Sequence, residues 1–307
     1  MSRRRKAWMR DVNGILLLDK PEGLSSNHAL QRVRRLYSAA KAGHTGSLDP
    51  LATGMLPVCF GPSTKLSHYL LDADKQYTVG VAVGQRTSTG DAEGGVVAHS
   101  DARPPRERME SALAGFIGPV QQIPPMHSAV HHQGRRLYEI AREGGEVERA
   151  ARTVTIHALE ILDWSPERFT LRVRCSKGTY VRTLVEDLAA SVGTEAHVAR
   201  LHRDAVSPFP GDALRTMAEI EAAAEQGAEA LDALLLPPSA ALADWPGVAL
   251  DAARAFYLSR GEAVRVASAP SAGRVAIYGP GDVLLALGEI NADGMVAPRR
   301  MMQTAAP

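Results

Sequence analysis

The segment 43–54 (GHTGSLDPLATG) holds a single carboxylate, Asp49, in an unusual setting. Three glycines and a proline interrupt the segment, which predicts a loop rather than a regular helix or strand. Leu48, Pro50 and Leu51 surround the acid with apolar groups, whereas acids in ordinary surface loops lie among polar residues. A carboxylate is ionised at neutral pH and can act as a nucleophile without a base. Two interpretations remain open from the loop alone: a catalytic aspartate, or an Asx-type turn residue before proline.

Three other side chains could assist such a carboxylate. Arg182 is expected on the polar side of a helix, where its guanidinium could hold Asp49 ionised or could pair with Glu186 one turn later. Tyr180 begins the same helix just after a glycine turn, so its ring could project into a cleft. Tyr77 shares a strand face with three valines. For both tyrosines, plain core packing is the alternative.

The remaining candidates are basic. His44 lies between two glycines without Cys or His at ligand spacing, which argues against a metal role. Lys20 is the first cation after a predicted buried strand and could contact a phosphate or be solvated. Residues 124–152 contain three histidines and five arginines, a setting that suits phosphate contacts and base stacking better than a metal site. Sequence patterns of phosphate-binding loops, dinucleotide folds and zinc proteases are absent.

Regular elements must position these residues. Apolar patterns predict strands at 14–19, 76–83, 154–162 and 169–175, and helices after Ser25 or Ser26, at 106–116 and at 180–192. Residues 212–245 are expected to be helical with loops, and short strands follow at 263–266, 274–278 and 283–290. Strands and helices mix without strict alternation, which favours an α+β fold over a doubly wound one. We place a domain boundary near residue 245.

Composition and charge indicate a globular protein with a polyanionic partner. Hydrophobic residues make up 45% of the 307, and no apolar run approaches the roughly 20 residues that span a bilayer. The run at 14–18 is too short for a signal peptide, so we expect a cytoplasmic protein. Cys59 and Cys175 are far apart and are expected to be buried, reduced thiols. Residues 1–210 carry 28 Lys and Arg against 22 Asp and Glu, whereas 211–262 carry 3 against 9. This pattern suits a polyanionic partner of the first part or arises by chance.

Four blocks of the chain resemble bacterial tRNA pseudouridine synthases of the TruB type. They are residues 14–26 (GILLLDKPEGLSS), 42–59 (AGHTGSLDPLATGMLPVC), 77–94 and 175–188 (CSKGTYVRTLVEDL), and segments 116–152 and 193–209 are also similar. Together they span most of residues 14–209 in the expected order, and the block around Asp49 is highly specific. Departures from the family pattern include Ser47, Ser88, His127 and His131, none of them at a catalytic position.

The resemblance implies an activity and a set of site residues. The activity is an isomerisation that converts the uridine at position 55 in the T loop of tRNA to pseudouridine, with no cofactor and no metal, after the base is flipped out. Asp49 would be the nucleophile, with Arg182 and Tyr77 as further catalytic residues. Substrate contacts would come from His44, Tyr180, Leu201 and Lys20. His44 would fill the place of the flipped base, whereas Tyr180 and Leu201 would wall its pocket.

The resemblance also implies an architecture. Residues 1–245 would form a catalytic domain with a central mixed or antiparallel sheet flanked by helices, and residues 124–152 a thumb-like RNA-binding insertion. Residues 246–307 would form a small, mostly-β PUA-like RNA-binding domain. The partner would be the T arm of tRNA, with no membrane and no obligate protein partner, and the enzyme would be a monomer. Whether Asp49 attacks C1′ of the sugar, attacks C6 of the base or promotes an elimination stays open.

Three other hypotheses are compatible with parts of the sequence. The first is an RNA-binding or tRNA-folding chaperone, an activity that could coexist with catalysis. The second is a pseudouridine synthase for other RNAs or within a guide-RNA particle, against which the long insertion and small C-terminal domain argue. The third is a glycoside hydrolase, which requires a second working carboxylate. No second working carboxylate is evident in the resembling blocks, which argues against this hypothesis.

Overall fold

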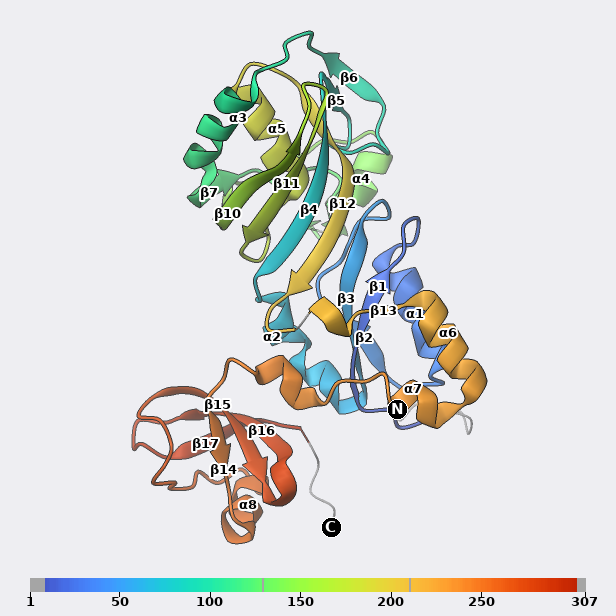
Figure 1. The fold of residues 1–307 in the computed structure, drawn as a ribbon. Helices are drawn as coiled ribbons and strands as arrows, with labels where there is room; N and C mark the ends of the chain where they lie inside the picture. Colours follow the sequence, from blue (N-terminus) through green and yellow to red (C-terminus); the bar gives the residue numbers. More distant parts are fainter. Residues whose placement is uncertain (1–8, 129, 210, 303–307) are drawn as a thin grey trace.

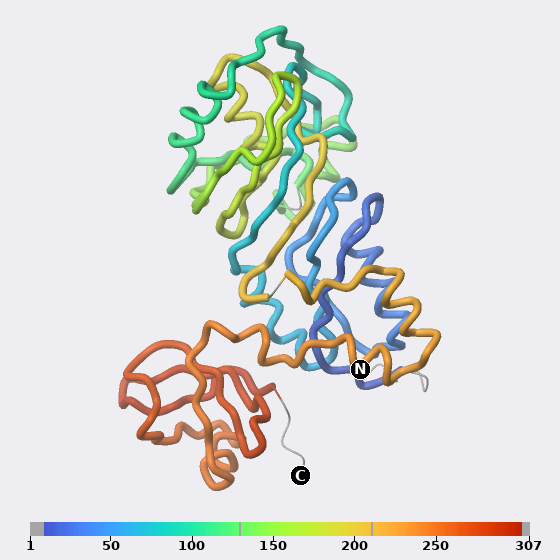
Figure 2. The backbone as a smooth tube through the Cα atoms, in the orientation of Figure 1, coloured from blue at the N-terminus to red at the C-terminus, as the bar shows by residue number. Residues whose placement is uncertain are grey.

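The computed structural model describes residues 9–128, 130–209 and 211–302. A nine-stranded mixed sheet runs through its larger part, in the order β13-β1-β3-β12-β4-β11-β10-β7 with β2 beside β3 (Figures 1 and 2). The strands are β1 (Gly14–Lys20), β2 (Ala42–His44), β3 (Thr53–Phe60), β4 (Lys75–Val83), β7 (Gly118–Gln122), β10 (Arg152–Trp164), β11 (Arg168–Cys175), β12 (Ala196–Val206) and β13 (Arg215–Thr216). The β1–β13 and β12–β3 pairs are parallel and the others antiparallel, so the expected α+β class with a mixed sheet is confirmed.

One face of this sheet is covered by helices that share a single core with it. These are α1 (Ser26–Leu36), α3 (Arg106–Leu113), α5 (Val181–Ser191) and α6 (Met217–Gln226) (Figure 1). On β4, Tyr77 and Val79 point into the core and Thr78 lies on the half-exposed opposite face, as the alternating sequence predicted. Ser25, rather than Ser26, caps α1 by accepting a hydrogen bond from His28 N.

Strand β1 is buried on both faces, which explains its uninterrupted apolar sequence. Leu16 and Leu18 join the helix-covered core. Ile15 and Leu17 belong to a second core on the opposite face. This second core also includes residues of the 3₁₀ turn Gly61–Leu66, of α2 (Ser67–Leu71) and of the C-terminal sheet. The β1–β3 region is therefore the junction between the two sheets.

A second, four-stranded sheet forms the C-terminal part. It consists of β14 (Gly247–Ala249), β15 (Gly273–Gly279), β16 (Val283–Ile290) and β17 (Val296–Met301), with α8 (Ala252–Ser259) beside it. The strands expected at 274–278 and 283–290 are confirmed. The strand expected at 263–266 is wrong, because Val264 makes only an isolated bridge to Val296.

The remaining elements are short. Residues 124–152 form a hairpin of β8 (His131–His132) and β9 (Arg135–Arg136) followed by α4 (Leu137–Arg142). A second hairpin consists of β5 (Gln85–Thr87) and β6 (Val96–His99), and α7 (Ala228–Asp232) follows α6. The remaining 3₁₀ turns are Ala114–Phe116, Gly211–Ala213, Pro238–Leu242 and Pro280–Asp282. Both cysteines are buried free thiols, as expected. Within the described ranges, no helix has the length and apolar character needed to cross a membrane.

Gly54, the second residue of β3, is the glycine on which this arrangement depends most. Its φ is +97°, and a Cβ at this position would lie 2.3 Å from the backbone oxygen of Arg203 on β12. We expect Gly54→Ala to lower the free energy of unfolding by more than about 2 kcal/mol, since both the left-handed backbone and the overlap are unfavourable. Urea unfolding followed by circular dichroism measures this.

The matched control is Gly95→Ala. Gly95 has no positive φ, and nothing lies within 4 Å of the Cβ it would gain. This variant should stay within about 0.5 kcal/mol of the wild type. Equal unfolding free energies for the two variants would contradict the assigned role of Gly54.

Candidate active site

Asp49 stands on the loop between β2 and β3, and contacts to the backbone hold this loop in place. The hydroxyl of Ser26 accepts a hydrogen bond from Leu48 N (2.7 Å) and donates one to Leu48 O (3.0 Å). Arg203, only 1% exposed on β12, donates to Gly46 O (2.9 Å). Because these contacts engage the backbone on the N-terminal side of Asp49, its carboxylate is left free.

Lys20 is another anchor of the same loop, and its position argues against the expected contact with the substrate. Its side chain is fully buried. Its ammonium donates to Pro21 O (2.8 Å), Leu24 O (2.7 Å) and Pro50 O (3.3 Å). Burial lowers the pKa of Lys20 to about 8, and the nearby Asp49 opposes this fall. An ammonium that is fully buried and bonded to three carbonyls has neither the surface nor the donors to bind a phosphate.

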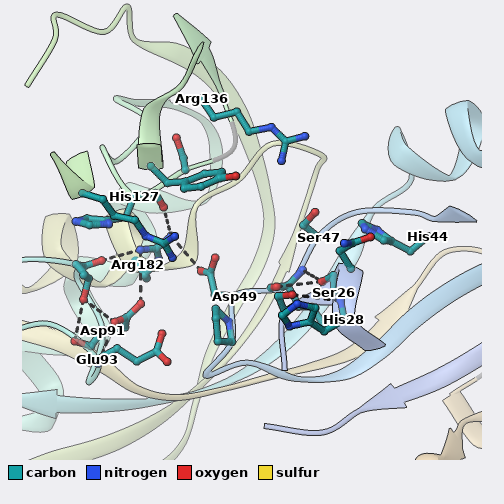
Figure 3. A pocket seen from close by; sticks show the side chains of 18 residues that line it. Ser26, His28, His44, Ser47, Asp49, Asp91, Glu93, His127, Arg136 and Arg182 are labelled. Atoms are coloured by element: carbon teal, nitrogen blue, oxygen red, sulfur yellow. Dashed lines mark hydrogen bonds and ion pairs between the residues drawn. The ribbon is translucent and has the colours of Figure 1, made fainter. Parts of the chain in front are cut away.

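Arg182 joins Asp49 to two other segments (Figure 3). Its guanidinium lies 3.0 Å from the Asp49 carboxylate and 3.5 Å from that of Asp91, and donates to Thr89 O and His127 O, both at 2.8 Å. The side chain is 7% exposed, so at this residue the polar side of α5 faces other segments of the protein. These four contacts with other segments take the place of the alternative interpretation, an ion pair with Glu186 within α5. The buried charge is compensated on every side, which holds the Asp49 carboxylate in one direction.

Asp91 is a second carboxylate of the site, which the sequence analysis missed. It follows β5 and is 3% exposed. One oxygen accepts from Thr89 Oγ1 (2.6 Å) and Glu93 N (3.1 Å), and the other faces Arg182. Because protein groups occupy both oxygens, Asp91 balances the charge of Arg182 and does not present a second working acid. The expectation that the resembling blocks hold no second working carboxylate is therefore not overturned by Asp91.

The charges around Asp49 act in opposite directions. Desolvation in the cleft raises the pKa of its carboxyl above the ordinary value. Arg182 is the main group that lowers it, and Asp91 raises it again. The net direction is upward, so Arg182 limits the rise without cancelling it. The side chain keeps 43% of its surface open, which leaves the carboxylate accessible to a ligand.

Asp49 lies between two cavities. The larger, about 790 Å³, is bounded by the start of α1, by β2 and by the 124–152 insertion. The smaller, about 310 Å³, lies among β4, β12 and the start of α5. Both are lined by Ser47, Leu48, Asp49, Ser128 and Arg182. Figure 3 shows Ser26 and His44 on one side of Asp49 and Arg182 on the other.

Besides Asp49 and Arg182, the smaller cavity is lined by three further expected site residues: Tyr77, Tyr180 and Leu201. Tyr77 is 9% exposed, and burial raises the pKa of its phenol, which stays neutral. Leu201 is 7% exposed and lies opposite Val79 in the sheet. The pocket thus offers two aromatic rings, an aliphatic side chain and the neutral hydroxyl of Tyr77. These groups suit a planar ligand with a polar edge.

His44 lies in the larger cavity, apart from those three residues. Burial, helped by Arg203, lowers the pKa of its imidazole, which favours the neutral ring. Among the described residues, its Nδ1 has no hydrogen-bond partner, and the same is true of the buried Ser128 hydroxyl. Unpaired buried polar groups beside a cavity indicate ligand contact, and Ser128 was not identified from the sequence. Within the described ranges, no group of three or more His, Cys, Asp or Glu is placed to hold a metal ion.

Comparison with known proteins agrees with this geometry. Residues 34–181 match the N-terminal domain of the TruB family pseudouridylate synthases, 182–243 the tRNA pseudouridylate synthase B C-terminal domain, and 246–302 the C-terminal domain of pseudouridine synthase II TruB. Similar relatives are the tRNA pseudouridine synthases B of Nitrosococcus oceani (49% identity, 98% of each chain) and Pseudomonas putida (50% identity, 97% of this chain and 98% of the relative).

Solved structures share the fold. The "Cbf5-Nop10-Gar1 Complex" contains a chain that matches with a TM-score of 0.74 over 94% of this chain and 85% of its own, at 24% identity. Its architecture is the pseudouridine synthase fold, a central mixed sheet with helices and a C-terminal β domain. Together with the close relatives, this shows that the chain belongs to the TruB family of pseudouridylate synthases.

The effect of Arg182 on the pKa of Asp49 can be measured without substrate. Replacement of Arg182 by Met removes the main group that lowers the pKa of Asp49, so this pKa should rise further. Carbon-detected NMR titration of the aspartate carboxyls measures it. Arg172→Met is the control, because Arg172 pairs with Glu160 at an exposed position on β11. An unchanged Asp49 pKa in Arg182→Met would contradict the assigned electrostatic coupling.

Proposed function

We propose that this chain converts the uridine at position 55 in the T loop of tRNA to pseudouridine, with Asp49 as the nucleophile. The observation that carries the proposal is the carboxylate of Asp49, held by Arg182 at the junction of two cavities. The relatives at about half identity over nearly the whole chain support the choice of tRNA as substrate. A protein that only binds RNA would have no need of this buried array of charges.

The reaction is an isomerisation. The C1′–N1 bond of uridine breaks, the uracil turns, and C1′ bonds to C5, while C5 loses a proton and N1 gains one. The molecule as a whole is neither oxidised nor reduced, because the formal changes at C1′ and C5 cancel, so the chemistry needs no redox cofactor. The site must stabilise the sugar or base while they are separated, and must keep the detached base within reach. An ionised carboxylate beside a small pocket meets both needs.

The small cavity is assigned to the detached base. Tyr77 would pack on the sugar or base from β4 and carry a proton on its neutral phenol. Tyr180 and Leu201 would wall the pocket, and Asp49 would face the sugar at its mouth. Attack at C1′, attack at C6 and elimination all require the ionised carboxylate. Because folding raises the pKa of Asp49, activity should be lost as the pH falls through that raised value.

The large cavity is assigned to the neighbouring loop nucleotides. Flipping a base out of a folded loop costs a few kcal/mol. A neutral His44 in the vacated position would recover part of this, since stacking contributes about 1–3 kcal/mol per base. Separate cavities for His44 and the tyrosines fit this assignment, because the histidine would occupy the place that the uracil leaves.

The insertion at 124–152 is proposed as the RNA-gripping thumb of a catalytic domain formed by residues 1–245. Arg136 and Arg142 line the large cavity, and both lie near the ring of Tyr138. We also propose residues 246–307 as a PUA-like RNA-binding domain, supported by their separate sheet. We further propose a monomer in the cytoplasm, where the tRNA substrate is found.

Asp49→Asn tests the nucleophile. The amide keeps the size of the side chain but is a far weaker nucleophile, so pseudouridine formation should be abolished while tRNA affinity stays within about threefold. Carbodiimide-dependent reverse-transcriptase stops on an unmodified tRNA transcript measure the product, and filter binding the affinity. Exposed Asp101→Asn is the control and should retain wild-type activity. A T-loop stop of wild-type strength in Asp49→Asn would exclude this role.

Arg136→Gln tests the thumb. Loss of one phosphate contact should weaken tRNA binding and reduce the slope of log affinity against log salt by about 1. Filter binding between low and moderate salt measures both. Arg135→Gln is the control, because Glu143 already balances Arg135. Identical salt slopes for the two variants would argue against a phosphate contact at Arg136.

A further inference from the structure

Gln122 ends β7, immediately before the insertion, and its side-chain amide is paired with the backbone of Tyr180. Tyr180 N donates to Gln122 Oε1 (3.0 Å), and Gln122 Nε2 donates to Tyr180 O (3.2 Å). Gln122 is 2% exposed. Two residues 58 positions apart are thus joined by a closed pair of hydrogen bonds in a buried setting. Buried polar groups need hydrogen-bond partners, and here the amide oxygen and the amide nitrogen both find theirs on Tyr180.

Tyr180 needs such a partner because of its position. It is the N-cap of α5, and its own side chain makes no capping hydrogen bond. Its carbonyl also accepts the first helical bond of α5, from Leu184 N (3.0 Å). The amide of Gln122 therefore holds the backbone N–H and carbonyl of the residue at which α5 begins. Arg182 follows two residues later on the same helical turn.

A second contact joins the same segment to α5. His127 O, five residues after Gln122, accepts from the guanidinium of Arg182 (2.8 Å). The stretch 122–127 is hence bound at one end to the residue that walls the small cavity and at the other to the residue that holds Asp49. This stretch includes the start of the insertion, and the next residue is tied to α4, since Ser128 O accepts from Tyr138 N (3.1 Å).

We propose that Gln122 is a positioning residue for the reaction: its paired hydrogen bonds hold Tyr180 in the wall of the uracil pocket and tie that wall to the base of the RNA-gripping insertion. This inference rests on the proposed function. Gln122 lines neither cavity, so it acts only through Tyr180. Its loss should leave a buried N–H without a partner and let the ring leave its productive position, while the RNA-binding surface stays intact.

The test compares two neighbouring glutamines. Gln122→Met keeps the side-chain length and removes both hydrogen bonds. Gln121→Met is the control, because the amide of Gln121 donates only to exposed Thr153 Oγ1 (2.8 Å). With unmodified tRNA transcript at saturating enzyme, Gln122→Met should lower the single-turnover rate constant at least about tenfold, with the tRNA Kd within about threefold of wild type. Gln121→Met should match the wild type in both.

A double-variant cycle separates positioning from general destabilisation. If Gln122 acts through Tyr180, then Gln122→Met combined with Tyr180→Ala should react within about twofold of Tyr180→Ala alone. Multiplied losses in the double variant would overturn the proposal. The rates are measured below the unfolding midpoints of all variants. Gln122→Glu, which keeps the acceptor for Tyr180 N and loses the donor, should be slower than wild type and serves if the Met variant fails to fold.

The outcomes distinguish this inference from the proposed function. Absence of pseudouridine formation in tRNA by the wild-type protein would contradict the proposed function itself. An active wild type with equal single-turnover rates for Gln122→Met and Gln121→Met would leave the function in place and overturn the role of Gln122.

Discussion

The site depends on one buried positive charge. A guanidinium that is 7% exposed must be neutralised and hydrogen-bonded, because an unpaired ion in that setting is strongly destabilising. Arg182 meets this requirement with two carboxylates and two backbone carbonyls, which come from the Asp49 loop, the β5–β6 hairpin and the start of the insertion. The same charge that needs these partners thereby brings together three segments that are distant in the sequence.

The Asp49 loop illustrates how rigidity and accessibility are combined. Its anchors, Ser26, Arg203 and Lys20, all engage backbone atoms, so the loop is held without use of the carboxylate. The acid stays 43% exposed between two cavities while its backbone is fixed. Preorganisation of this kind is effective because the carboxylate need not be ordered when a ligand arrives. The buried Lys20 contributes to it by bonding to backbone carbonyls.

The two cavities are proposed to hold different parts of the RNA. Burial keeps both the phenol of Tyr77 and the imidazole of His44 neutral, on opposite sides of an acid whose own pKa is raised. Neutral rings suit contacts with a base, whereas the arginines of the insertion suit the phosphates. The segment 122–127 connects these regions through hydrogen bonds to Tyr180 and Arg182. The insertion and the geometry at Asp49 are therefore physically linked.

The sequence by itself determined the α+β class, four of the nine strands of the large sheet (β1, β4, β10 and β11), two of the four C-terminal strands (β15 and β16) and the helices α1, α3 and α5, because periodicity is a local property. Loop composition singled out Asp49 but left its role open. The resemblance of the sequence to a family also indicated Tyr77, Tyr180, Leu201 and Arg182. Only the tertiary structure decided that Lys20 is buried, that Asp91 shares Arg182, and that Gln122 holds Tyr180. These facts depend on hydrogen bonds and ion pairs between segments far apart in the chain, whose partners no local pattern specifies.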